Sequence, residues 1–487
     1  MGIVQNQSIK NSIITFIGFG LGAINALFFY THFLGKLHYG IVNTLLSGAN
    51  ILMPIMAFGA HNTLIRFFTS YKIEEKKERF LSFMLVWPLF MSIPLFFLYF
   101  LFYNHIVTFG IDKNPEMRPF IGLFPVIGIF MGYSEVFFAW AKVHLQSVIG
   151  NLINEVLVRF LVMLFLLGVH FDILTKFQCI YAIAFAYFCQ MVVMMWYAFK
   201  IKFPKLQFQF PENFREIVSY SLFIIVSGGV AVMLIDFDKM MIYKMMKVTN
   251  NAVYSVGIFM ATLISVPSRA MIQIVAPITS RLVAEKKWTE LNELYKKTSI
   301  TLQVSGGLIM LLLFVNIHEI YKIIPDNYQG GIYVVFLIGI SKFFDLIVGN
   351  NNNIITNTNY YRTVILLGVF TVVLMLFLNW LLIPLYGING SALATLLTIF
   401  IYNSIKLYFV VKKLNLFPFT LKNLISVLVI VLLFLCFSFW DFKFTALLNI
   451  ILKSILVSLF YVFINYKLQI SEDFNRVVAM VLHKIKA

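Results

Sequence analysis

The chain has 487 residues, of which 60% are hydrophobic, 17% are aromatic and only 12% are charged, and its formal net charge is +17. An ordinary soluble domain is about one quarter charged. This composition and a mean hydropathy of +0.88 exclude a soluble fold. Cys179, Cys189 and Cys436 have no metal-ligand spacing and are predicted to be packed thiols.

Apolar segments follow one another along the whole chain, each near the roughly 20 residues that cross a bilayer. They predict an all-α integral membrane protein with about 14 transmembrane helices. The first segment has no small-residue cleavage site after it, so we expect a retained helix. Its Gly18 and Gly22 fit a small-xxx-small packing face. The fourteen predicted segments are 11–33, 39–64, 81–103, 119–141, 149–169, 178–199, 218–243, 252–276, 299–317, 331–349, 363–383, 389–410, 423–440 and 446–465.

The loops alternate between basic and charge-poor. The even-numbered connections and the tail hold most of the Lys and Arg residues, for example Lys76, Lys205 and Lys412, whereas the opposite side holds few. The positive-inside rule therefore predicts that both termini are cytoplasmic. We interpret the net positive charge as the cause of this topology and as a source of contacts with anionic lipid headgroups. Nucleic acid is not an expected partner, because no basic run is interleaved with aromatics outside the predicted spans.

The predicted loops are too short to hold a soluble catalytic domain, and no stretch matches the phosphate-binding G-x-x-x-x-G-K-[ST] motif. We therefore expect a protein that is not an enzyme and does not hydrolyse ATP. The loop Lys286–Lys297 is predicted to be an amphipathic helix on the membrane surface, since Trp288, Leu291 and Tyr295 lie on one apolar stripe. A similar helix is expected in the tail from Phe474 to Lys484.

An internal repeat appears when the chain is shifted by 215 residues. Tyr39 begins the second segment and Arg66 ends it, as Tyr254 and Arg281 do in the eighth. Two six-helix halves with two further helices explain this spacing. Because six is even, both halves enter the membrane from the same side, which is a parallel repeat typical of secondary transporters. The predicted divisions are an N-terminal lobe at 1–210, a C-terminal lobe at 211–415, and two added helices with an amphipathic tail at 416–487.

Three sequence elements resemble a known family. They are Phe33–Gly40 (FLGKLHYG), Asp238-Lys239 ahead of Tyr254-Ser255-Val256, and Asn379–Ala392 (NWLLIPLYGINGSA). These elements are similar to those of the polysaccharide-exporter branch of the MATE-like superfamily, and the resemblance covers nearly the whole chain.

This resemblance implies a flippase that moves undecaprenyl-diphosphate-linked oligosaccharides from the cytoplasmic to the periplasmic leaflet of the bacterial inner membrane by alternating access. It implies assembly of a surface polysaccharide such as an O-antigen, lipopolysaccharide or capsule. The implied partners are the polyprenyl-diphosphate-linked glycan, membrane lipids and polysaccharide polymerase machinery. No cofactor is expected besides H+ or Na+ as a coupling ion.

Ionisable residues within the predicted spans are the candidate site. Nine such groups facing lipid would cost on the order of 20 kcal/mol at roughly 2.5–3.5 kcal/mol each, so they are expected to pair or to line water. The nine are Glu135, Glu155, Arg159, Asp236, Asp238, Lys239, Arg269, Lys342 and Asp345. Glu155 with Arg159, Asp236 with Lys239, and Lys342 with Asp345 have helical pair spacing. The candidate diphosphate ligands are Arg159, Lys239, Arg269, Lys342, Arg66 and Arg281, and the candidate ion-coupling residues are Glu135, Glu155, Asp236, Asp238 and Asp345.

Two interpretations of these charges stay open, a hydrated cavity and structural pairs that neutralise themselves. Glu135 and Arg269 have no oppositely charged residue at helical pair spacing. The alternative for both is that the side chain extends to the inner lipid headgroups. Asp236 and Asp238 are alternatively exposed to the outer headgroups.

Other functions fit parts of the sequence. Asp236-Phe237-Asp238 has the D-x-D pattern of a membrane glycosyltransferase, although its carboxylates lie inside a predicted span. A small-molecule antiporter usually has twelve helices. A peptidoglycan-precursor flippase has fourteen but carries arginines in its first helix, whereas this chain has no cation between Lys10 and Lys36.

The topology is testable by cysteine labelling in a cysteine-free background. Single cysteines near Lys76, Lys205 and Lys412 should be shielded from an impermeant thiol reagent in intact cells, because these loops are predicted to be cytoplasmic. Cysteines near Asn114 and Asp326 should react. The reverse pattern would overturn the orientation.

Overall fold

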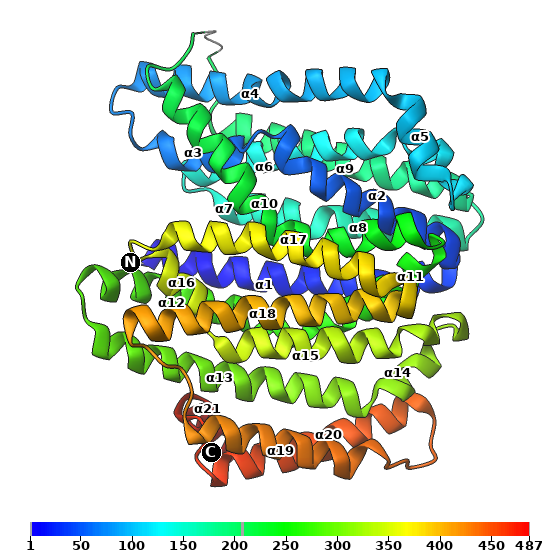
Figure 1. The fold of residues 1–487 in the computed structure, drawn as a ribbon, viewed down its shortest axis with the longest axis vertical. Coiled ribbons are helices and arrows are strands. Elements are labelled where there is room, and N and C mark those ends of the chain that lie inside the picture. The colour runs from blue at the N-terminus through cyan, green and yellow to red at the C-terminus, as the bar shows by residue number, and fades with distance from the viewer. Residues whose placement is uncertain (1, 206–208, 487) are drawn as a thin grey trace. The chain divides into compact units, whose positions relative to one another are not determined.

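The protein is described here by a computed structural model that covers residues 2–205 and 209–486, and every regular element in these ranges is a helix (Figure 1). Within the described residues, twelve helical stretches are long and apolar enough to cross a membrane, and Met271–Ala284 is a shorter apolar helix. The chain is therefore a multi-pass membrane protein. It forms two compact units, Met1–Ala252 and Val253–Ala487.

All fourteen predicted segments correspond to helices. The longest apolar stretch, Ile13–Met56, has 44 residues, which is twice the length that a bilayer requires. It is divided at Gly35, whose φ of 77° only glycine adopts easily, and so covers most of the first predicted segment and the first part of the second. The predicted segment 218–243 lies in the helix Phe214–Met245, in which the side chains of 226–235 are outside the described part of the structure.

Several helices of the first unit are interrupted. Helix 2 ends at Met56 after Pro54, and the chain restarts at Ala60 after Phe58 and Gly59, which both have positive φ. The first and fifth predicted transmembrane segments each contain a π-helical segment, η1 and η3. Such segments are rare in proteins and are often found at functional sites. The elements of this unit are α1 (Gly2–Ile24), η1 (Asn25–Leu34), α2 (Gly35–Met56), α3 (Ala60–Phe68), α4 (Glu74–Leu101), α5 (Tyr103–Ile111), η2 (Pro115–Phe120), α6 (Leu123–Val143), α7 (Ser147–Leu152), η3 (Ile153–Leu157), α8 (Val158–His170), α9 (Lys176–Ile201) and α10 (Phe214–Met245).

The second unit begins inside α11. The 3-10 segment η4 separates α11 from α12 and ends two residues before Pro267, which lies in the first turn of α12. The elements are α11 (Thr249–Thr262), η4 (Leu263–Ser265), α12 (Val266–Ala284), α13 (Trp288–Val315), α14 (Ile317–Ile323), η5 (Asp326–Gly331), α15 (Ile332–Val348), α16 (Asn351–Thr356), α17 (Tyr361–Tyr386), α18 (Ile388–Leu414), α19 (Leu421–Ser438), α20 (Ala446–Lys467) and α21 (Glu472–Lys486).

The same pairs of helices pack together within each unit. In the first unit α3 contacts α4, α4 contacts α6, α6 contacts α9, and α8 contacts α9. The corresponding contacts in the second unit join α12 to α13, α13 to α15, α15 to α18, and α17 to α18. This equivalence confirms the predicted repeat of six helices. The two added helices, α19 and α20, pack on each other and on α13 (Figure 1).

The helix α10 packs against α2 and α3. For this reason the first compact unit extends to Ala252, beyond the lobe boundary that was predicted at residue 210. The compact units do not test the three predicted lobes. The lobes stay predictions, with bounds at 1–210, 211–415 and 416–487.

Ion pairs hold the connection after α9 against the start of α4. The Glu78 side chain is only 10% exposed, and its carboxylate lies 3.5 Å from Lys202 Nζ and 3.2 Å from Lys205 Nζ. Lys202 also donates to Glu74, and this hydrogen bond raises the pKa of Lys202. The basic loops at this predicted cytoplasmic end are thus ordered partly by acidic partners.

The predicted surface helix at Lys286–Lys297 is wrong. From Trp288 onward these residues form the first turns of α13, which continues to Val315. Leu291 and Tyr295 are fully buried in a core with Ile354 and Val410. The apolar stripe therefore packs on the protein instead of on lipid, because α16 and the end of α18 cover it.

Gly390 provides a test of the turn between α17 and α18. A Cβ there would lie 2.1 Å from the Leu382 carbonyl oxygen, whereas a Cβ at Gly20 would meet nothing within 4 Å. We expect Gly390→Ala to destabilise the protein by about 1–3 kcal/mol through overpacking and Gly20→Ala to leave its thermal midpoint unchanged. Thermal unfolding in detergent measures both, and equal midpoints for the two variants would contradict this packing.

Candidate functional site

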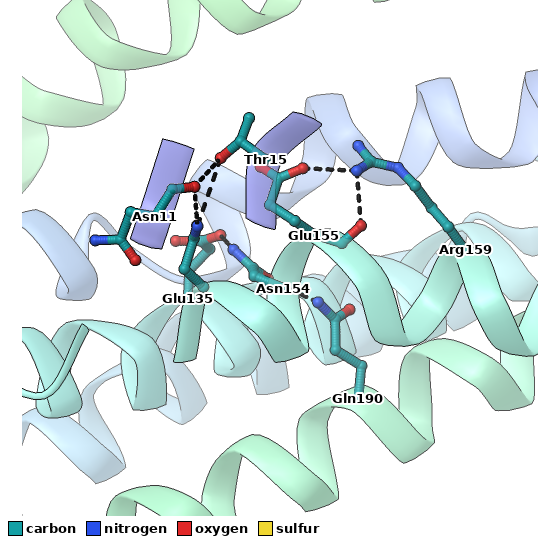
Figure 2. Close-up of polar contacts among 8 residues, drawn as sticks. Asn11, Thr15, Glu135, Asn154, Glu155, Arg159 and Gln190 are labelled. Carbon is teal, nitrogen blue, oxygen red and sulfur yellow. Dashed lines mark hydrogen bonds and ion pairs between the residues drawn. The ribbon is translucent and has the colours of Figure 1, made fainter. Parts of the chain in front are cut away.

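The predicted charges of the first unit gather around helix 5, which consists of α7, η3 and α8. In η3, Asn154 donates through Nδ2 to Glu135 Oε1 on α6 at 2.9 Å. Gln190 on α9 donates through Nε2 to Asn154 Oδ1 at 2.6 Å. Figure 2 shows this chain of three side chains, which joins α6, η3 and α9.

Helix 1 adds polar groups to the same region (Figure 2). Asn151 donates to the backbone oxygen of Asn11 at 3.2 Å, and its second contact is Thr15 Oγ1 at 3.5 Å. The side-chain oxygen of Asn11 is buried and has no hydrogen-bond partner among the described residues. A buried acceptor without a partner is costly, so this region has capacity for water or a ligand.

The next residue of η3, Glu155, forms the predicted pair with Arg159. Arg159 Nη1 lies 2.6 Å from Glu155 Oε2 and 2.7 Å from the Glu155 backbone oxygen. The two side chains keep 37% and 27% of their surface exposed, Arg159 first. In the described part of the chain both of these bonds use Nη1, which leaves the Nε and Nη2 donors of the guanidinium available.

Gly18 creates the space for this arginine. A Cβ at Gly18 would lie 2.6 Å from Arg159 Nη1 and 2.6 Å from the Glu155 backbone oxygen. The close packing predicted from Gly18 therefore occurs, and it is an approach of helix 1 to helix 5 at the ion pair.

Asp236 on α10 lies on the same side of the unit. Arg159 on α8 and Asp236 both act electrostatically on the Tyr187 hydroxyl of α9, so α8, α9 and α10 converge there. Asp236 is 7% exposed, lies against Ser47 and Asn50 of α2, and is within electrostatic range of Lys239. The Asp236–Lys239 pair stays a prediction. Asp238 is 1% exposed.

Two titratable groups lie beside Glu135. His61 on α3 and Lys142 on α6 both interact electrostatically with the Glu135 carboxylate. The Lys142 ammonium is 3.7 Å from the centre of the Phe138 ring, and Asn62 hydrogen-bonds His61 Nε2 at 2.9 Å. Glu135 thus has one titratable neighbour from another helix, His61 on α3, and one from its own helix, Lys142.

In the second unit, Asp345 on α15 accepts a hydrogen bond from Asn403 Nδ2 on α18 at 2.9 Å. Lys406, one turn further along α18, is 5% exposed, interacts electrostatically with Asp345, and lies 4.0 Å above the Tyr402 ring. Lys342 is half-buried one turn before Asp345 on α15. The Lys342–Asp345 pair stays a prediction.

The remaining predicted cations lie near helix ends. Arg66 is exposed on α3 and sits 5.3 Å from the centre of the Tyr220 ring. Arg269 is exposed in the first turn of α12. Arg281 is exposed near the end of α12, where it acts on Glu285.

Sequence analysis missed the amides Asn154, Gln190 and Asn403, because an uncharged residue in an apolar run gives a weak signal. It also missed Lys406 and Lys453, although both lie within predicted segments and are 5% and 4% exposed. The signal that could have found them was a lysine inside an apolar run.

The Arg159 guanidinium gives the first unit a group that suits an anion. No group of three His, Cys, Asp or Glu side chains that could hold a metal occurs among the residues searched, which are the described ones. A guanidinium with unused donors binds phosphate oxygens well. The neighbouring amides and carboxylates supply acceptors and donors for a polar ligand.

Comparison with known proteins gives a consistent picture. Residues 4–283 match a family model described as polysaccharide biosynthesis protein. No curated protein matches the sequence. The lipid II flippase MurJ in an inward closed conformation has a similar fold, with a TM-score of 0.76 and 17% identity over 95% of this chain and 100% of that one.

Two transporter structures are also similar. An inward-facing multidrug resistance MATE family transporter of the MOP superfamily has a TM-score of 0.65 and 10% identity, over 84% of this chain and 98% of that one. A MOP superfamily transporter from Pyrococcus furiosus has a TM-score of 0.56 and 12% identity, over 84% and 95%. At these identities the similarity concerns the fold.

The Glu155–Arg159 pair can be tested for stability. Arg159→Leu strands a carboxylate in the bundle and should cost about 1–2 kcal/mol, less than a fully buried pair because both side chains are partly exposed. The double variant Glu155→Gln/Arg159→Leu should recover the thermal midpoint in detergent. If the double variant is less stable than Arg159→Leu alone, the two charges are not paired.

Proposed function

The chain belongs to the polysaccharide biosynthesis protein family of the MATE-like superfamily, and on this premise we propose that it is a flippase for undecaprenyl-diphosphate-linked oligosaccharide repeat units. It moves them from the cytoplasmic to the periplasmic leaflet of a bacterial inner membrane, and it is not an enzyme. The glycan is used for a surface polysaccharide such as an O-antigen, lipopolysaccharide or capsule, in cooperation with a polymerase. Family membership and the transporter fold support this proposal.

One observation carries the proposed substrate class. Arg159 is held inside the bundle with its Nη1 bound to Glu155 and its Nε and Nη2 donors unused among the described residues. These donors match the oxygens of a diphosphate. Asn154 and Gln190 beside it offer hydrogen bonds to sugar hydroxyls, and the polyprenyl tail remains in lipid. Lys239, Arg269, Lys342, Arg66 and Arg281 are proposed as further cations along the path.

The driving force follows from the charge of the substrate. A diphosphate with about two negative charges gains about 4–5 kcal/mol per 100 mV when it leaves an inside-negative cytoplasm. We propose Glu135 and Asp345 as sites for a coupling H+ or Na+, since each is a membrane carboxylate bound to an amide. Glu155, Asp236 and Asp238 are further candidates. The potential alone is the alternative drive and requires no ion site.

The similarity to MurJ supports a second candidate, a peptidoglycan-precursor flippase, which would use the same diphosphate chemistry. A small-molecule antiporter is the weaker alternative, because the family match concerns polysaccharide. A glycosyltransferase is disfavoured. Asp236 and Asp238 lie inside α10 rather than on a loop, and helix positions i and i+2 do not face each other.

Deletion of the gene should abolish a surface glycan and cause its lipid-linked repeat unit to accumulate on the cytoplasmic face, because synthesis precedes flipping. Mass spectrometry of extracted lipids identifies the accumulated intermediate, and complementation is the control. A deletion strain that lacks the intermediate would contradict the flippase and favour a synthetic role. Accumulation of the peptidoglycan precursor instead would establish the second candidate.

Proteoliposomes test the role of Arg159. The wild type should translocate the isolated intermediate without ATP and respond to an imposed potential, pH gradient or Na+ gradient. The double variant Glu155→Gln/Arg159→Leu should fold normally and translocate roughly 10–100 times more slowly, because it loses charge-assisted hydrogen bonds of about 1.5–3 kcal/mol. Arg269→Ala should reduce the rate less, since its side chain is exposed. Full transport by the double variant would remove Arg159 from the substrate site.

A further inference from the structure

A second polar cluster lies in the second unit, where α14 packs on α20. Glu319 on α14 is 5% exposed, and its Oε1 accepts a hydrogen bond from Lys322 Nζ at 2.7 Å. Its other oxygen, Oε2, is buried without a hydrogen-bond partner among the described residues. The carboxylate is therefore only half satisfied.

The facing side of α20 has the same property. Asn449 is 1% exposed and donates to Asp441 Oδ1 at 2.9 Å, while its own side-chain oxygen has no partner in the described part of the chain. Asn316, next to α14, donates to Ser454 Oγ on α20 at 3.1 Å, and its side-chain oxygen is likewise unpartnered. Three buried oxygens, on Glu319, Asn449 and Asn316, thus lack donors among the described residues.

Asp441, in the connection between α19 and α20, links these groups to the surface. Its Oδ1 also accepts the Lys443 backbone N–H at 2.9 Å. This bond lowers the pKa of Asp441, with further contributions from Lys322, Asn449 and Lys453. Lys322 from α14 and the 4% exposed Lys453 from α20 therefore both lie near this carboxylate.

Aromatic side chains surround Asp441 in the sequence. Trp440 is 48% exposed and stacks on Phe437, with ring centres 5.4 Å apart and planes inclined by 8°. Phe439 and Phe444 are 89% and 59% exposed. An aromatic belt at a membrane interface accounts for exposed rings of this kind. It does not account for the half-satisfied polar groups beside them.

The mixture of charges selects the kind of ligand. Glu319 and Asp441 repel an anion, and Lys322 and Lys453 repel a metal ion. A neutral polyhydroxyl ligand needs both donors and acceptors, which this cluster offers, and an aromatic face beside a few polar groups is typical of small-molecule sites. A sugar fits all of these features.

We propose that Glu319, Asp441, Asn449, Lys453 and Trp440 form a carbohydrate-binding site on the predicted outer side of the second unit. Trp440 offers a flat surface to a pyranose ring, and the exposed Asp441 carboxylate accepts hydrogen bonds from its hydroxyls, while the buried Glu319, Asn449 and Lys453 lie behind it. The identity of the sugar rests on the proposed function, in which the glycan emerges on this side after translocation.

The test measures binding without transport. The probe is the oligosaccharide released by mild acid from the lipid-linked intermediate, observed by saturation-transfer NMR with the full-length protein in detergent. We expect binding to wild type and a loss of at least fivefold in affinity for Trp440→Ala and for Asp441→Asn, both of which change exposed side chains and should leave the thermal midpoint intact.

Trp380→Ala is the matched control, because Trp380 is 62% exposed near the end of α17 on the same predicted side. It should bind as wild type does. Absence of binding to wild type, or equal binding by Trp440→Ala and Trp380→Ala, would overturn the site and leave Trp440 as an interfacial anchor. Failure of wild-type transport in proteoliposomes with oligosaccharide binding intact would instead overturn the flippase and leave this site standing.

Discussion

A polar side chain in a hydrocarbon environment has to find its partner within the protein, because no water is present to replace it. In the first unit this constraint makes helix 5 the centre of the arrangement. Asn154 donates to Glu135 on one neighbouring helix and accepts from Gln190 on another. The adjacent Glu155 binds Arg159 instead. The π-helical segment η3, with its wider turn, contains both residues and presents them to different partners.

The repeat preserves one of these contacts. Asp345 follows Glu135 by 210 residues and Asn403 follows Gln190 by 213, close to the shift of 215 that relates the tyrosines and arginines of helices 2 and 8. In both units a carboxylate on the fourth helix is thus connected to an amide on the sixth, through Asn154 in the first unit and directly in the second. Glu135 is partly buried, so its carboxylate would lose a partner inside the bundle without Asn154.

Hydropathy was sufficient to locate the fourteen segments, since each has to be apolar over a bilayer thickness. The Glu155–Arg159 pair was also predictable, because its spacing is local. Contacts between helices were not: Glu135 and Asn154 are 19 residues apart and meet only because α6 and helix 5 pack. The stripe at Leu291 and Tyr295 was assigned to lipid because periodicity identifies an apolar face without identifying what covers it. Whether a particular charge lines a substrate path depends on such packing.

Arg159 is the clearest case of a site that stability alone would not favour. A guanidinium whose donors are only partly used, with over a third of its side chain exposed, is a poor structural ion pair. Gly18 nevertheless leaves room for it by keeping helix 1 without a side chain at this point, and glycine in a helix interior is itself unfavourable. The partly used guanidinium and the helical glycine each cost stability, and they meet at one contact. Such costs are expected where residues serve function rather than folding. The geometry here is consistent with a cation kept open for an anionic ligand.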